Sequence, residues 1–92
     1  LETYNEILLQ KEDNKITINL RKFNKLDEYI KERLIIYIIA KLFGDARGIE
    51  NIHVFDIVKL CEKNVGNKYL TPNKNLKIFV KSGEVSYEKL LK

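Results

Sequence analysis

Basic side chains that could bind phosphate fall into two groups along the chain. Lys15, Arg21, Lys22 and Lys25 form the first group, and Lys68, Lys74, Lys77 and Lys81 form the second, with Tyr69 and Phe79 among them. Lysine and arginine can follow a nucleic-acid backbone without reading its sequence. Lysines on edge strands also protect proteins from aggregation. The residues alone therefore leave two interpretations open: a phosphate-binding surface, or an ordinary charged surface.

Residues with catalytic potential are few. The chain has no glycine-rich phosphate loop and no cluster of residues with metal-ligand spacing. His53 and Asp56 are three positions apart and could touch on a helix, although such pairs on a helix surface more often have no catalytic role. We therefore predict no catalytic residue and no metal site, and an independent enzyme using His53 and Asp56 is the weakest hypothesis.

Composition indicates one small globular domain. The 92 residues are 45% hydrophobic, with a net charge of +4 and a pI near 9.2. No apolar segment is long enough to cross a bilayer, so we expect a soluble, cytoplasmic protein without a membrane partner. The single cysteine, Cys61, cannot form an internal disulfide and is expected to be a buried thiol. Because the sequence contains no methionine and opens on Leu1, we expect a piece of something larger.

The elements that must position these side chains are organised around residues 26–43, LDEYIKERLIIYIIAKLF. Apolar residues recur there with helical spacing, Gly44 follows at a natural stop, and Asn24 is the expected N-cap. This segment should be a helix in the middle of the domain.

The remaining elements complete an α+β prediction. Residues 1–9 read as the end of a helix, 10–14 as a polar turn, and 15–21 as a half-buried strand. Residues 51–63 predict a second helix, with Ile52, Val54, Phe55, Ile57, Val58 and Cys61 on its buried side. Short strands should follow, with turns at residues 72–75 and 82–84 and with residues 85 and 87 on an antiparallel return strand. We therefore expect a single domain in which two packed helices cover a small antiparallel sheet.

This order of elements resembles a known family. The segments KITINLRKF, LDEYIKERLIIYIIAKLF, NIHVFDIVKLCEKN and KYLTPNKNLKIFV are similar to the domain that follows the catalytic domain of bacterial tRNA(Ile)-lysidine synthetases. The resemblance covers about residues 15–87. Its specific features are Arg33 before an apolar run, Ile52-His53-Val54 at the start of the second helix, and LTPNKN in place of a Leu-Pro-x-Gly motif. Thr71 separates Leu70 from Pro72, and Asn75 stands where the family has glycine.

The resemblance implies a larger enzyme, an ATP-dependent ligase that attaches lysine to the wobble cytidine of an isoleucine tRNA. Its PP-loop belongs to the upstream catalytic domain and is not in this chain, so ATP and lysine would be cofactor and substrate of the parent enzyme only. Residues 1–14 would then be the tail of an upstream helix with its turn, and residues 15–92 a tRNA-binding type of domain.

Two functional hypotheses follow. In the first, the chain is a non-catalytic tRNA-binding fragment whose phosphate contacts are Lys22, Lys25, Arg33, Lys77 and Lys81. Arg33 could instead anchor Glu28 or Glu32. The expected partners are isoleucine tRNA and the upstream catalytic domain, and dimerisation stays open. In the second hypothesis, the chain is a protein-docking or dimerisation module without nucleic-acid contact.

Overall fold

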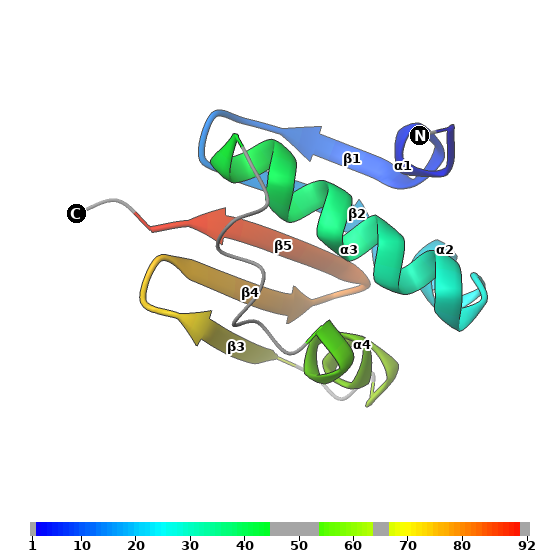
Figure 1. Ribbon diagram of the computed structural model, residues 1–92. Coiled ribbons are helices and arrows are strands. Elements are labelled where there is room, and N and C mark those ends of the chain that lie inside the picture. Colours follow the sequence, from blue (N-terminus) through cyan, green and yellow to red (C-terminus); the bar gives the residue numbers. More distant parts are fainter. Residues whose placement is uncertain (1, 45–53, 64–66, 91–92) are drawn as a thin grey trace.

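The centre of the fold is an antiparallel sheet of five strands. The computed structural model describes residues 2–44, 54–63 and 67–90. The strands are β1 (Leu8–Lys11), β2 (Lys15–Asn19), β3 (Lys68–Asn73), β4 (Leu76–Lys81) and β5 (Glu84–Lys89). Their order across the sheet is β1-β2-β5-β4-β3, so the last strand of the chain lies in the middle (Figure 1). The pairing of β2 with β5 therefore connects the N-terminal and C-terminal parts of the sequence within the sheet.

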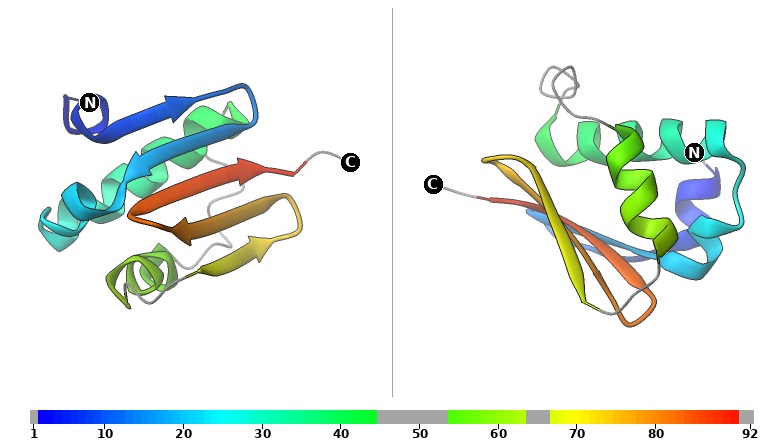
Figure 2. Two further views of the ribbon diagram at one scale, coloured as in Figure 1. Left: turned by 180° about the vertical axis from the view of Figure 1, so that it is seen from behind. Right: turned by 90° about the horizontal axis from the view of Figure 1, so that it is seen from below.

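The helices of the described residues cover one face of this sheet and leave its other face open, as Figure 2 shows. The helices are α1 (Glu2–Ile7), α2 (Leu20–Asn24), α3 (Glu28–Phe43) and α4 (Val54–Lys63). Alternate strand residues face them and are buried: Ile16, Ile18, Leu76, Ile78, Val80, Val85 and Tyr87. The predicted α+β class is confirmed, and so are the antiparallel return of residues 85 and 87 and the turn at Ser82 and Gly83. The sheet is larger than predicted, and α2 was not predicted.

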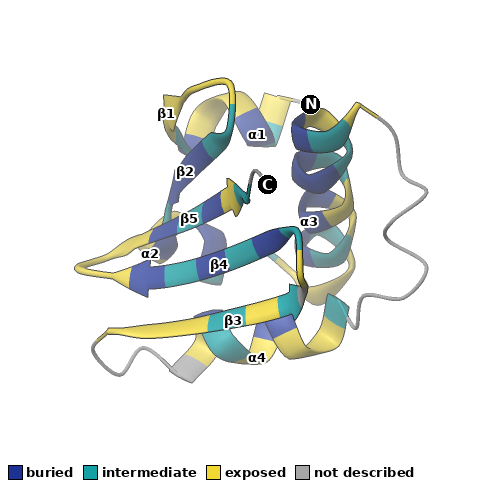
Figure 3. Cartoon of the chain, turned by 90° about the vertical axis from the view of Figure 1, so that its left-hand side faces the viewer, coloured by how far each residue is buried: buried dark blue, intermediate teal, exposed yellow. Residues whose placement is uncertain are grey.

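The long helix α3 lies across the sheet, and Figure 3 shows its buried side facing the strands. It begins at Glu28, because the Asp27 carboxylate accepts a hydrogen bond of 2.9 Å from the Ile30 N–H. The prediction of Asn24 as the N-cap is therefore wrong. Asn24 ends α2, and its side chain donates to the Cys61 carbonyl of α4 at 3.1 Å. The predicted end is confirmed, since Gly44 adopts a φ of +85° there and its N–H donates to the Ala40 carbonyl.

Helix α4 packs against α3 with Ile57, Val58 and Cys61 buried, as predicted. Phe55 is an error of the prediction, because its side chain is 52% exposed. Two residues correspond to about 200° around a helix, so Phe55 lies on the side opposite Ile57. The Lys59 ammonium lies 4.7 Å from the centre of its ring. The predicted start of this helix, including Ile52 and His53, falls outside the described residues.

The first part of the chain differs most from the prediction. The helix expected over residues 1–9 ends at Ile7, and the expected turn begins only after Lys11, because Leu8–Lys11 pairs with β2 as an edge strand. The strand expected over residues 15–21 ends at Asn19, whose side chain accepts from the Lys22 N–H at 2.9 Å and caps α2. Both errors have one cause. Short elements with polar residues show little hydrophobic periodicity, and tertiary pairing decides their conformation.

Candidate nucleic-acid interface

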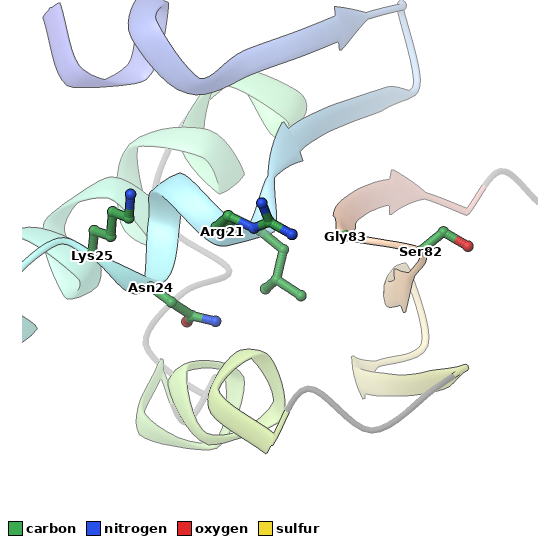
Figure 4. A pocket seen from close by; sticks show the side chains of 6 residues that line it. Arg21, Asn24, Lys25, Ser82 and Gly83 are labelled. Atoms are coloured by element: carbon green, nitrogen blue, oxygen red, sulfur yellow. The ribbon is translucent and has the colours of Figure 1, made fainter.

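A cleft of about 510 Å³ opens between α2 and the turn that joins β4 to β5. Its lining residues are Leu20, Arg21, Asn24, Lys25, Ser82 and Gly83. Figure 4 shows Arg21 and Asn24 on α2 and Lys25 directly after it, across the cleft from Ser82 and Gly83. Two exposed cations thus lie across from a turn that is distant in sequence, and in this view the Ser82 side chain points away from α2.

Backbone contacts hold the two walls of this cleft together. The Leu20 N–H, at the start of α2, donates to the Gly83 carbonyl at 2.9 Å, and the Leu20 side chain is buried. Ser82 and Gly83 have φ values of 51° and 80°, the left-handed conformation that a tight two-residue hairpin turn requires. Arg21 and Lys25 are four residues apart, so helical geometry brings them to neighbouring positions on the surface of α2. The cleft is therefore a product of the fold rather than of one flexible loop.

Of the five predicted phosphate contacts, Lys25 lines this cleft, and Lys81 adjoins one of its lining residues in sequence. Lys81 is not among the lining residues; it directly precedes Ser82 at the exposed end of β4, on the same face of the strand as Lys77 and Phe79. Lys81 also lies opposite Glu84 in the strand register, so an acidic neighbour is close to it in the sheet. Arg21 belongs to the first basic group but was not among the five predicted contacts. Its spacing from Lys25 becomes informative only when residues 20–24 are known to be helical.

Lys22 lies on another side of α2. Together with Lys25 it lines a groove of about 370 Å³ that α1 closes with Thr3, Glu6 and Ile7. Glu6 brings negative charge to this groove, which makes it a less favourable place for phosphate than the cleft.

Lys77 projects from β4 on the open face of the sheet, away from the helices. Its ammonium lies 5.1 Å from the ring centre of Tyr69 and 5.6 Å from that of Phe79. In the strand register it is opposite Glu88. Lys77 is therefore part of a separate surface.

Arg33 lies on the outer side of α3. Its guanidinium donates to the Tyr29 hydroxyl at 2.9 Å and lies 5.6 Å from the centre of that ring, so its observed partner is Tyr29 rather than Glu28 or Glu32. Both residues line an apolar groove of about 480 Å³ with Ile36, Tyr37 and Ala40. The five predicted contacts are thus spread over several surfaces, and only Lys25 lines the cleft.

The groups with shifted pKa values lie in the core and not at this cleft. Burial raises the pKa of the Cys61 thiol to about 12 and raises that of the Tyr87 hydroxyl well above its usual value. The predicted burial of Cys61 is confirmed. Neither group is charged at neutral pH, so neither contributes to ligand binding through its charge.

Residues 2–44, 54–63 and 67–90 contain no cluster of three or more potential metal ligands. Within the same ranges, no helix has the length and apolar character needed to cross a membrane. Asp56 is exposed on α4, while its proposed partner His53 is outside these ranges, so the acid-base hypothesis stays untested.

Comparison with known proteins relates the chain to a tRNA-modifying enzyme. No protein-family model matches the chain. Over 82 residues, the chain is 29% identical to the tRNA(Ile)-lysidine synthase of Clostridioides difficile (strain 630). The aligned segment covers 89% of this chain and 18% of that protein, so the chain corresponds to less than a fifth of its relative. The similarity agrees with the resemblance seen in the sequence motifs.

Proposed function

We propose that this chain is a non-catalytic tRNA-binding domain of a larger ligase related to tRNA(Ile)-lysidine synthase. In this proposal the parent enzyme uses ATP to join lysine to the wobble cytidine of an isoleucine tRNA. Adenylation and lysine transfer take place in a part of the parent that this chain does not contain. The similarity to the Clostridioides difficile enzyme supports the family relationship, and the cleft beside α2 supports the binding role.

The single observation that carries the binding role is the pairing of Arg21 and Lys25 across the cleft from Ser82 and Gly83. Phosphate oxygens accept hydrogen bonds from guanidinium, ammonium and hydroxyl groups, and an arginine can donate to two of these oxygens at once. Lys81 adds a further cation beside the turn. The cleft therefore suits two neighbouring phosphates of an RNA backbone.

The chemistry of the same lining supports binding rather than catalysis. Among the described residues that line the cleft, none is a carboxylate, a histidine or a thiol. A general acid or base with a pKa near neutrality is therefore absent from this lining.

Protein docking is a second candidate, and the outer side of α3 favours it. Tyr29 and Ile36 are 66% and 38% exposed beside the groove that Arg33 and Tyr37 line. Exposed apolar residues in one groove are typical of a surface that another protein covers. Docking of the parent's catalytic domain on α3 would be compatible with tRNA binding at α2, because the two surfaces have no lining residue in common.

The first experiment is a titration of the chain with fluorescently labelled isoleucine tRNA and with an unrelated tRNA from about 50 to 200 mM salt. The unaltered chain should bind more weakly as salt rises, because each phosphate contact releases counterions. The variant Arg21→Gln/Lys25→Gln/Lys81→Gln should reduce the slope of log affinity against log salt by about 2, at roughly 0.7–0.9 per contact.

A matched control separates the cleft from general charge. The variant Lys11→Gln/Lys59→Gln/Lys74→Gln removes the same charge from exposed positions outside the cleft lining. It should retain most of the salt slope. Equal losses in both variants would mean that only net charge matters, and no tRNA binding at low salt would favour the docking function instead.

A further inference from the structure

The open face of the sheet carries two aromatic side chains on neighbouring strands. Tyr69 of β3 and Phe79 of β4 are directly paired in the antiparallel register, and both point away from the helix-covered face because Leu70, Ile78 and Val80 occupy the alternate positions. The Tyr69 side chain is 63% exposed, and Phe79 is partly buried. Two ring faces are thus presented side by side on a rigid element.

The surroundings of these rings are polar. The Lys77 ammonium lies 5.1 Å from the centre of the Tyr69 ring and 5.6 Å from that of the Phe79 ring. Beyond Phe79, the same cross-strand row continues with Ser86 and Thr17, whose hydroxyls are 3.1 Å apart. These side chains are shorter than an aromatic ring, so Phe79 stands above them.

Charges alternate in the row beside the aromatic pair. Lys15, Glu88 and Lys77 follow one another across β2, β5 and β4, and on the other side Glu84 lies next to Lys81. The cores of protein–protein interfaces are depleted of charged residues, so a dry protein interface fits this face poorly. A stacked nucleotide fits it better, because its base needs only a ring face while its phosphate needs a nearby cation.

We propose that the open face of β3 and β4 binds unpaired bases of RNA, which stack on Tyr69 and Phe79 while Lys77 contacts a phosphate. This inference rests on the proposed RNA-binding function and adds the chemical class of the ligand at a second surface. Stacking tolerates any base, since every base has a π face. The cleft beside α2 contacts the backbone, and the sheet face distinguishes unpaired from paired nucleotides.

The test compares two labelled RNAs with the same number of phosphates, a single-stranded oligoadenylate and a blunt duplex. The variant Tyr69→Leu/Phe79→Leu keeps apolar side chains but removes both ring faces. It should bind the single strand about tenfold or more weakly, given roughly 1–3 kcal/mol per stacked base, and should change duplex binding less than about twofold. Two exposed aromatic residues outside the sheet, Tyr29 and Phe55, provide the control. The variant Tyr29→Leu/Phe55→Leu should leave single-strand binding unchanged.

Phe79 is partly buried, so Tyr69→Leu alone serves as the variant that cannot disturb the core, with an expected loss of about threefold or more. Single-strand binding equal to that of the unaltered chain in both sheet variants would overturn the stacking inference. The proposed tRNA-binding function would still stand if the Arg21, Lys25 and Lys81 variant lost duplex binding. Absence of binding to both RNAs by the unaltered chain would overturn both proposals.

Discussion

Cys61 is the residue whose protonation is most affected by the fold. Its side chain is fully buried where α4 meets α3, and burial raises the thiol pKa from an ordinary 9.0 to about 12. The nearby Lys31 ammonium acts in the opposite direction, with a smaller effect. A thiol that stays protonated is a poor nucleophile, and the buried Cys61 side chain packs in the core.

The raised pKa predicts that stability falls with alkaline pH. Between pH 9 and 12 the unfolded chain loses the Cys61 proton while the folded chain keeps it, so the free energy of unfolding decreases as pH rises. From pH 8 to 10 this contribution lowers the free energy of unfolding by about 1.4 kcal/mol. Urea denaturation at both pH values measures this decrease. The free energy of unfolding of Cys61→Ala should fall between the two pH values by about that amount less than that of the unaltered chain. Equal losses in the two proteins would contradict the assigned pKa.

Among the elements, α3 and the β4–β5 hairpin were the easiest to predict. Apolar residues alternate in the hairpin strands, while in α3 the flanking charges and Gly44 distinguish a helix from a buried strand. Glycines end the helix at Gly44 and form the turn at Gly83. The short elements α2 and β1 were not predicted, because a five-residue helix and a four-residue edge strand are too short to show a period. The error in the N-cap of α3 followed from this, since Asn24 belongs to the undetected α2.

The observed cap gives a prediction at this scale. Asp27→Ala removes the acceptor of the Ile30 N–H and should lower the free energy of unfolding by about 0.5–2 kcal/mol. Glu28→Ala, in the first turn of the same helix, changes an exposed side chain without removing a cap and should cost less than about 0.5 kcal/mol. Urea denaturation followed by circular dichroism compares the two variants. A larger loss for Glu28→Ala than for Asp27→Ala would show that the dipole, and not the cap, stabilises this end.

At the scale of the whole molecule, the two candidate RNA-binding surfaces depend on long-range pairing. The cleft combines residues 20–25 with residues 82–83, and the β2–β5 pairing brings these segments together. The sequence patterns identified both basic groups but not their separation, because strand order is set by the packing of the entire core. Of the five predicted contacts, only Lys25 lines the cleft. The division of the chain at residue 14 stays a prediction.

The packing of α1 provides the test of that division. Tyr4 and Ile7 are buried in the same core as α3 and the sheet, and the Tyr4 ring meets Tyr37 edge to face at 5.1 Å. If residues 1–14 are structurally part of the domain, Ile7→Ala should lower the free energy of unfolding by about 2–5 kcal/mol. Leu9→Ala, at a half-exposed position two residues later, should change it by less than about 0.5 kcal/mol. Chemical denaturation measures both effects. A negligible effect of Ile7→Ala would mean that residues 1–14 are a separable tail, because a detachable helix contributes nothing to the stability of the remaining core.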